Sequence, residues 1–501
     1  MSYRLSVTAA SIAAVFVLGG CGSGTAGTNA ADATSARIAV PSSISTLDPL
    51  TAASQADTRA VALVAGTLYA FDFGAKVLTP VPSLASGAST SQDGLTVTVT
   101  LKDGLTFSDS SPLTVDDVVA TFERGLASPL AGDEVFGSIA GVQAVGQDVV
   151  FTLRQPRADF LSQISTSKAA ILPRRASTDE AFFDDPVFAG PFSVEGDFRG
   201  REVKLVRNPN FGGAAPALDE VNLVTVADPY AALSQLQSGS IDLVTPVPAD
   251  RFVSLPDSVV TQTVATAATE VLTFNNDVAP LNDPRVRQAI GVAVDREALT
   301  AIGFHGIAEP ASTPVPFVGD RMKPVLEPKA DLDRARELLV GTACENGCTF
   351  DVNTASSDSI SGQIATAIQQ MLSPVGITAN PVAVDDTTLV ERNFNGEFTS
   401  MVTPFGGGTL AAYLSATLNP AGGLQAAFSY WDRPDANALI GQVIALPDEE
   451  QGPALEQLRA AYVQDFPWIP LASAPSLVAV KKGLESKITV GVSDMIEVAP
   501  R

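Results

Sequence analysis

Short apolar segments with the pattern of buried strands alternate with segments of helical spacing along most of the chain. Residues 95–101 (LTVTVTL) alternate strictly between apolar and polar side chains, which is typical of a half-buried strand. Residues 57–69 instead place Val61, Val64 and Leu68 on one face of a helix. Strands that alternate with helices pack as layers, with the helices covering the sheet, so this order predicts an α/β fold.

The second half of the chain contains the clearest amphipathic segment. Apolar side chains recur about every four residues from Val286 to Leu299, and Pro284 suits the first turn of a helix. We therefore expect one helix over residues 284–299. With 501 residues the chain is too long for one ordinary hydrophobic core, and we expect two or more domains.

The charge balance is strongly acidic, with a formal net charge of −24. A nucleic-acid-binding protein needs clustered basic side chains to replace phosphate counterions, and Lys481-Lys482 is the densest such pair. We therefore expect neither nucleic-acid binding nor attraction to an anionic membrane surface.

His305 is the one histidine of the chain, whereas metal sites and catalytic triads built on imidazole need a positioned ring nitrogen. The sequence also lacks the Gly-x-Ser-x-Gly and His-Glu-x-x-His motifs of common hydrolases. We expect no enzymatic activity, no bound metal and no cofactor. His305 itself is expected in a loop or at a helix end.

Residues 1–20 have the features of an export signal. After Arg4, residues 7–20 form an apolar stretch of about 14 residues, shorter than the roughly 20 needed to span a membrane. The stretch ends in Leu18-Gly19-Gly20-Cys21, which resembles the lipobox of bacterial lipoproteins. We expect lipidation at Cys21, with residues 21–36 as a flexible tether. The alternative is an uncleaved apolar N-terminus with an incidental cysteine.

Cys344 and Cys348 flank Asn346-Gly347, a pair of residues that favours a tight turn. Export would favour a disulfide between the two thiols. A metal site is the alternative, but two thiols without histidine provide too few ligands. We expect a disulfide that closes this short loop, and two free thiols would contradict it.

Several motifs follow one another in an order that resembles family-5 extracellular solute-binding proteins, the oligopeptide, dipeptide and nickel receptors of ABC importers. The central motif is Asn282-Asp-Pro-Arg-Val-Arg-Gln-Ala-Ile290, followed by residues 293–299 (AVDREAL). Further matches are residues 46–49 (TLDP), 101–107 (LKDGLTF), 190–192 (GPF), 207–211 (RNPNF) and 466–471 (FPWIPL). The likeness covers residues 37–485, and the joint order of the motifs is what makes it specific.

The resemblance implies a two-lobed clamshell like the periplasmic binding proteins of type II. Lobe I would comprise residues 37–267, including an extra subdomain at about 70–185, and the chain would return to it at 471–501. Lobe II would comprise residues 268–470. Two crossings would form a hinge, so that the lobes could close as rigid bodies over a ligand.

The resemblance also implies the partners and the location. The protein would act as a monomer, anchored by its lipid to the outer face of the cytoplasmic membrane, and would serve the permease and ATPase subunits of an importer. Its function would be to capture a peptide or a similar small solute. The alternative is an exported lipoprotein of the same fold that senses or scaffolds and has no dedicated transporter.

The segment at the expected ligand site departs from the peptide-binding relatives. In those relatives an aromatic and glycine-rich strand end is followed by acidic residues, one of which pairs with the α-ammonium of the peptide. Here Phe405 keeps the aromatic position, but Gly408 and Ala411 stand where the acids would be. A buried ammonium needs an anionic partner, so the ligand is uncharged, oriented differently or paired with an acid from elsewhere in the chain. A nickel complex is disfavoured because one histidine cannot build a histidine-assisted pocket.

We predict that the ligand is lined by aromatic side chains that stack on it, by amides that orient it and by glycines that let it approach the backbone. For each aromatic residue, core packing is the alternative. Arg285, Arg287 and Asp295 of the central motif are expected to pair with one another or with helix caps, and not to touch the ligand. The predicted lining residues are Gln55, Tyr69, Phe274, Asn275, Phe405, Gly406, Gly407, Tyr430 and Trp431.

Overall fold

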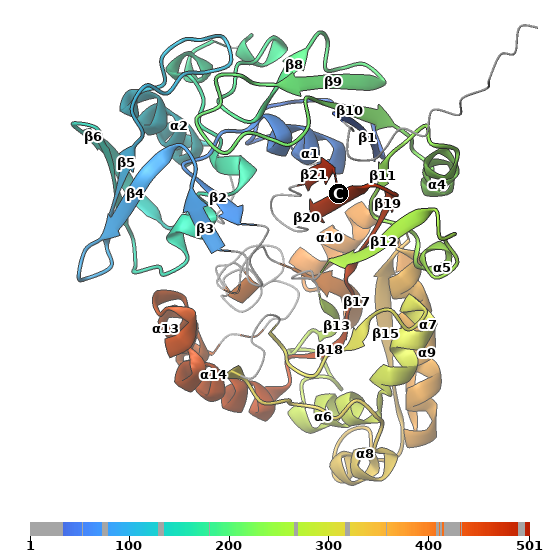
Figure 1. Cartoon of the computed structure of the whole chain (residues 1–501). Helices are drawn as coiled ribbons and strands as arrows, with labels where there is room; N and C mark the ends of the chain where they lie inside the picture. Colours follow the sequence, from blue (N-terminus) through green and yellow to red (C-terminus); the bar gives the residue numbers. More distant parts are fainter. Residues whose placement is uncertain are drawn as a thin grey trace, which may run out of the picture.

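The computed structural model consists of two lobes, each built on a large sheet with helices packed against it, and a smaller sheet attached to the first lobe (Figure 1). The fold is a two-lobed α/β architecture, as predicted. The structure describes residues 34–500, apart from residues 53, 73–78, 129–134, 180, 265–268, 316–320, 357, 407–409, 411–412, 415–430, 432 and 489–495.

Lobe I is built on a seven-stranded sheet with the order β12-β19-β11-β1-β10-β9-β8. β1 (Ser35–Val40) pairs in parallel with β10 (Glu220–Thr225) and β11 (Leu243–Val244). Each of these strands leads into a helix, namely α1, α4 and α5. The other elements are α1 (Gln55–Val64), β8 (Phe192–Glu195), β9 (Glu202–Arg207), α4 (Pro229–Ser238), α5 (Ala249–Phe252), β12 (Val259–Val264), β19 (Ser476–Lys481), β20 (Leu484–Ile488) and β21 (Ile496–Pro500).

The subdomain of lobe I contains an antiparallel sheet with the order β4-β5-β7-β6. Along β5 the buried residues alternate with partly exposed threonines, as the sequence pattern predicted. In its core the ring of Phe151 lies 4.8 Å from that of Phe122 and 5.2 Å from that of Phe160, measured between centroids. The elements are β2 (Tyr69–Asp72), β3 (Thr79–Pro82), β4 (Ala85–Thr90), β5 (Thr96–Leu101), α2 (Val115–Ala127), β6 (Ile139–Val145), β7 (Asp148–Leu153) and α3 (Phe160–Gln163).

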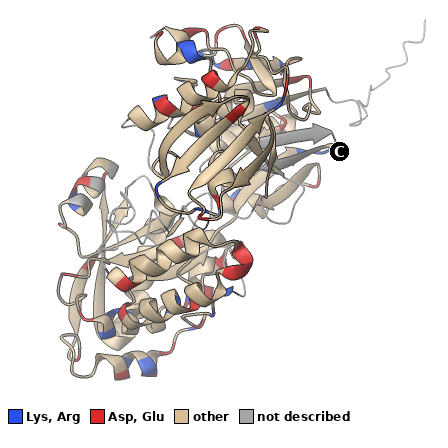
Figure 2. Cartoon of the chain, turned by 90° about the vertical axis from the view of Figure 1, so that its left-hand side faces the viewer, with Lys and Arg blue, Asp and Glu red and all other residues tan. Residues whose placement is uncertain are grey.

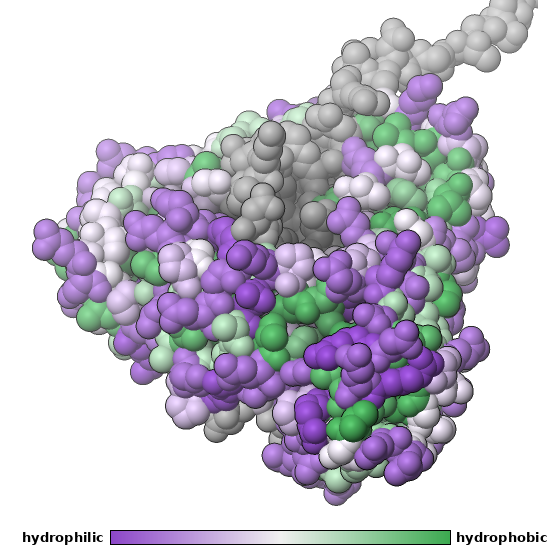
Figure 3. Space-filling model, turned by 90° about the horizontal axis from the view of Figure 1, so that it is seen from below, coloured by the Kyte–Doolittle hydropathy of each residue, from purple (hydrophilic) through white to green (hydrophobic). Residues whose placement is uncertain are grey.

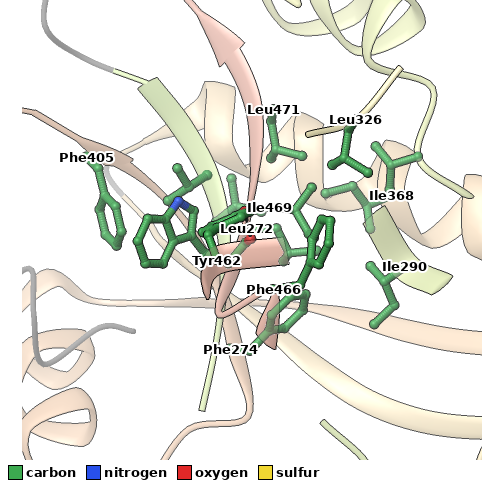
Figure 4. Close-up of a cluster of buried hydrophobic side chains, with 14 of the residues drawn as sticks. Leu272, Phe274, Ile290, Leu326, Ile368, Phe405, Tyr462, Phe466, Ile469 and Leu471 are labelled. Carbon is green, nitrogen blue, oxygen red and sulfur yellow. Dashed lines mark hydrogen bonds between the residues drawn. The ribbon is translucent and has the colours of Figure 1, made fainter. Parts of the chain in front are cut away.

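Lobe II is built on a six-stranded sheet with the order β14-β18-β13-β17-β15-β16. β13 (Thr269–Phe274) pairs antiparallel with β17 (Ser400–Phe405) and β18 (Trp468–Ser473), and its buried side chains join one large core (Figure 4). The other elements are α6 (Pro284–Ala293), α7 (Arg296–Phe304), β14 (Glu309–Pro310), α8 (Leu332–Leu339), β15 (Cys348–Ala355), α9 (Ser359–Leu372), β16 (Ile377–Val384), α10 (Asp386–Phe394), α13 (Pro434–Ala445) and α14 (Gly452–Asp465).

The helix predicted over residues 284–299 is two helices, α6 and α7. Val294 has φ −85° and ψ 118°, which are not helical values, and Asp295 caps α7 by accepting a hydrogen bond from the N–H of Ala298 at 2.9 Å. Both helices bury their apolar faces in the same core, so the apolar spacing continues across the break. A capping aspartate can interrupt a helix without disturbing that spacing, which explains the error. His305 ends α7, as expected.

The charged residues of the central motif hold the helices together. Arg285 donates to Asp283, the N-cap of α6, with Nη2 2.9 Å from Oδ2. Arg287 is buried and donates to backbone carbonyls, including Leu281 O at 2.6 Å and Phe466 O at 3.0 Å. The pairing of Arg285 with a helix cap agrees with the sequence-based expectation, whereas Asp295 is itself a cap and Arg287 bonds to the backbone.

The chain passes from lobe I to lobe II between Val264 at the end of β12 and Thr269 at the start of β13. It returns between Ser473 at the end of β18 and Ser476 at the start of β19. Residues 471–473, assigned to lobe I from the sequence, therefore belong to the sheet of lobe II. In lobe II, Cys344 and Cys348 are joined by a disulfide, with their Cα atoms 4.8 Å apart.

Candidate ligand-binding site at the junction of the lobes

In both lobes, the carboxyl ends of parallel strands face the junction between the lobes. In lobe I, β1 and β11 end at the edge where β19 begins, directly after the chain has returned from lobe II. In lobe II, β15, β16 and β17 run parallel and end at the edge where β13 begins. Ligands of open α/β sheets bind beyond the carboxyl ends of the strands. The topology of both sheets therefore places the candidate site at this junction.

Helix N-termini lie at the same junction because the strands lead into helices there. Ser54 caps α1, Asp358 caps α9 and Asp385 caps α10. The N-terminus of a helix carries a partial positive charge, which the two capping carboxylates offset. Across the molecule, basic and acidic side chains are scattered over both lobes without a block of either sign (Figure 2). The charged groups that the helix caps bring to the junction are the carboxylates of Asp358 and Asp385.

The loop between β1 and α1 is fixed by the carboxylate of Asp57. This group accepts hydrogen bonds from the N–H of Ser45 at 2.6 Å, from the Ser45 hydroxyl at 2.9 Å and from the N–H of Thr46 at 3.2 Å. Burial alone would raise the pKa of Asp57, but these bonds and one from Ser54 outweigh it and hold the pKa below its usual value. The motif at residues 46–49 is thus held rigidly at the lobe I side of the junction.

Among the predicted lining residues that the structure describes, Gln55 and Gly406 are the two that lie at the junction, one on the side of each lobe. Gln55 is the first residue of α1 in lobe I, and Gly406 directly follows β17 in lobe II. Both are partly exposed. Tyr69 begins β2, but its side chain is buried in the core of the subdomain, where burial raises its pKa.

Phe405, labelled in Figure 4, and Trp431 both belong to the hydrophobic core of lobe II. The ring of Phe405 is fully buried and lies 5.9 Å from that of Trp468, measured between centroids. Trp431 packs against Trp468 at 6.0 Å and donates from Nε1 to Asp465 Oδ2 at 2.7 Å. In this conformation both side chains contact the core, which is the alternative that the sequence left open.

Phe274 and Asn275 lie at the other end of β13 from the junction. Phe274 pairs with Ser400, whereas Thr269 pairs with Phe405 at the junction edge. Five residues of strand separate the two ends by about 17 Å. Asn275 donates from Nδ2 to Phe398 O at 3.2 Å, which fixes the loop before β17. The structure therefore does not bring these two residues together with Gln55 and Gly406.

The remaining candidates lie outside the described residues. These are Gly407 and Tyr430 among the predicted lining positions, Gly408 and Ala411 at the positions of the missing acids, and Cys21 as the lipid acceptor. In the part of the chain that is described, there is no group of three or more His, Cys, Asp or Glu side chains that could hold a metal ion. No described helix has both the length and the apolar character needed to cross a membrane.

Sequence reasoning missed Glu270, the second residue of β13. Its Oε2 atom is buried and has no hydrogen-bond partner among the described residues. Burial, together with the nearby carboxylate of Asp358, raises the pKa of Glu270 to about 8, although hydrogen bonding to the Ser361 hydroxyl offsets part of the shift. The available signal was one acidic residue among β-branched and apolar residues, at positions 269–274 (TEVLTF).

Two lobes joined by two crossings, with the carboxyl ends of parallel strands facing each other, define a two-lobed solute-binding protein. Residues 79–422 match the family described as bacterial extracellular solute-binding proteins, family 5. The chain belongs to this family, as its motifs predicted.

The glutathione-binding protein GsiB of Escherichia coli (strain K12) is 27% identical to the chain over 474 residues, which cover 89% of the chain and 90% of GsiB. Among solved structures, NikA from Brucella suis in complex with Fe(III)-EDTA is similar with a TM-score of 0.81 and 20% identity, covering 93% of this chain and 100% of NikA. The substrate-binding protein CtaP from Listeria monocytogenes is similar with a TM-score of 0.80 and 24% identity, covering 94% and 99% of the two chains. The two structures support the fold, and GsiB and CtaP are both named as binding proteins.

Proposed function

We propose that the protein captures a small peptide, or a solute of similar size, between its lobes and delivers it to the permease and ATPase subunits of an ABC importer. The observation that carries this proposal is the junction itself, where the strand ends of two sheets face each other across a two-crossing hinge in a family-5 chain. A ligand held there contacts both lobes and is buried when they close. We further propose that the protein acts as a monomer attached to the membrane through a lipid on Cys21.

Reduced glutathione is the first ligand to test, because GsiB, a relative over 90% of its own length, is a glutathione-binding protein. Gly408 and Ala411 replace the acids that would pair with a peptide α-ammonium. A ligand that needs no such partner, or that binds in another orientation, suits this chain better than an ordinary linear peptide.

Isothermal titration calorimetry of the purified chain with reduced glutathione and with unmodified di- and tripeptides tests the proposal. We expect one of these solutes to bind with one molecule per chain. Gln55→Ala should weaken that binding roughly threefold to tenfold, the effect of one lost hydrogen bond. Gln363→Ala is the matched control. Gln363 is an exposed glutamine, the fifth residue of α9, and is not among the predicted lining residues.

Native mass spectrometry of the protein purified from its own host complements the titration. A co-purified small solute would identify the ligand directly. An empty chain that binds none of the titrated solutes would contradict solute capture and favour an exported lipoprotein with a sensing or scaffolding role.

A further inference from the structure

The subdomain of lobe I touches lobe II through a short loop that lies away from the hinge. This loop, residues 156–159, connects β7 to α3, and the N–H of Ala158 donates to the carbonyl of Ile444 at 3.1 Å. Ile444 is in the last turn of α13 in lobe II. In Figure 1, α13 lies below the subdomain on the left, whereas β12 and β19, which lead into the two crossings, lie on the right. The contact therefore joins the subdomain to α13 at a place that is separate from the two chain crossings between the lobes.

Contacts within the subdomain support the donor loop. Arg157 donates from Nε to Asp159 Oδ1 at 3.0 Å and from Nη2 to Asp159 Oδ2 at 3.1 Å, and its side chain is only 6% exposed. Pro156 packs so closely on Gly94 of the β4–β5 turn that a Cβ at Gly94 would lie 2.8 Å from the Cβ of Pro156. These contacts within the subdomain fix the loop on both sides of the Ala158 amide.

The acceptor is equally well placed within lobe II. The last four carbonyls of a helix have no donor within the helix. In α13, the carbonyl of Val443 accepts from the N–H of Leu446 and from Nε2 of Gln451 at 3.2 Å. Gln451 is held in turn by Arg321, whose Nη1 lies 2.6 Å from Gln451 Oε1. Lobe II thus orders the end of α13, while the bond to Ile444 O comes from lobe I.

We propose that loop 156–159 is a latch that holds the two lobes closed by capping the C-terminus of α13. Rotation of the lobes about the hinge separates Ala158, which is exposed, from the buried Ile444, and the N–H and the carbonyl then bond to water instead of to each other. Exchange of one such hydrogen bond for water changes an equilibrium by only about twofold to tenfold. The latch therefore favours the closed form and still lets the lobes reopen. It concerns closure of the chain itself and does not depend on which solute binds.

Single-molecule fluorescence resonance energy transfer (FRET) on the ligand-free chain tests the latch. Fluorophores on Val145→Cys at the tip of the subdomain and on Glu449→Cys after α13 report the distance between the lobes, since both positions are exposed. Cys21→Ser keeps the labels off the N-terminus. Ala158→Pro removes the donating N–H, and we expect the ratio of closed to open molecules to fall roughly twofold to tenfold. Ala158→Ser keeps the N–H and should leave the ratio unchanged.

Hydrogen exchange in the unlabelled, unsubstituted chain gives a second measurement that does not require the proline variant to fold. The amide of Ala158 should exchange more slowly than that of Gln155, an exposed neighbour in the same loop region. Equal closed-to-open ratios in the proline and serine variants would overturn the latch. So would exchange at Ala158 as fast as at Gln155, or an unsubstituted chain with no closed population.

Discussion

Glu270 is an acidic residue among β-branched and apolar residues, directly after the chain enters lobe II. Its register partners are Pro404 on β17 and Ala472 on β18, and the charged group that raises its pKa is the carboxylate of Asp358, the N-cap of α9. Neither strand neighbour can neutralise a carboxylate. We therefore expect this one side chain, at the start of lobe II, to make the stability of the lobe depend on pH.

We expect the Glu270→Gln variant to be more stable than the parent chain at pH 8. Burial raises the pKa of Glu270 to about 8 in the folded chain from its ordinary value of 4.5, so between these values the folded state keeps a proton that the unfolded state has released. The free energy of unfolding therefore falls as the pH rises through this window, by at most about 1.4 kcal/mol per pH unit. The difference in melting temperature between variant and parent should be largest at pH 8 and smallest at pH 4.

Thermal unfolding across this pH range, followed by circular dichroism, makes the comparison. Glu309→Gln is the control, because Glu309 is an exposed carboxyl group on β14 of the same sheet. Its melting temperature should follow that of the parent at every pH. Parallel curves for the Glu270→Gln variant and the parent would show that Glu270 titrates normally.

At the scale of elements, the backbone at the end of α1 packs directly against the backbone of the segment that leads into β8. A Cβ at Gly190 would lie 2.2 Å from the carbonyl oxygen of Val64 and 2.4 Å from that of Ala65. The carbonyl of Gly190 in turn accepts a hydrogen bond from Asn208 Nδ2 at 2.8 Å. The glycine of the Gly-Pro-Phe motif is therefore required by backbone packing, and two of the family motifs meet at this point.

We expect Gly190→Ala to destabilise lobe I by about 1–3 kcal/mol, because the atoms that a Cβ would meet are backbone atoms and cannot move independently. Urea unfolding followed by tryptophan fluorescence or circular dichroism measures the change. Gly141→Ala on β6 is the matched control, because a Cβ there meets nothing within 4 Å, and it should change stability little. Equal stability of the two variants would contradict the close contact.

At the scale of the whole molecule, two α/β lobes with mostly buried apolar side chains present a largely hydrophilic surface, seen from one side in Figure 3. The net charge of −24 adds long-range repulsion between copies of the chain. We have proposed that membrane attachment comes from a lipid on Cys21, and this proposal can be tested on the whole chain.

We expect Cys21→Ser to release the protein from the membrane fraction of the cells that produce it. The thiol of Cys21 is the proposed lipid acceptor, and a serine hydroxyl does not replace it. Fractionation followed by intact-mass measurement gives the readout, since the parent chain should carry the mass of a lipid and the variant should not. Recovery of both chains in the membrane fraction, or an unmodified parent mass, would contradict the anchor.

The sequence by itself determined the local elements and the family. The alternating strand predicted at residues 95–101 is β5, His305 lies at the end of α7, and the ordered motifs led to family 5. These features depend on the alternation of apolar and polar side chains, on residues at helix ends and on short motifs. In each case the informative residues lie within a few positions of one another.

Only the tertiary structure decided which residues face the junction. The direction of β13 follows from its pairing with β17 and β18, more than a hundred residues away, and it carries Phe274 away from the junction while it places Glu270 there. The burial of Phe405 and Trp431 and the contact between Ala158 and Ile444 depend on equally distant segments. Side-chain patterns report local periodicity, whereas strand pairing and lobe packing are fixed by contacts between parts of the chain that the sequence keeps far apart.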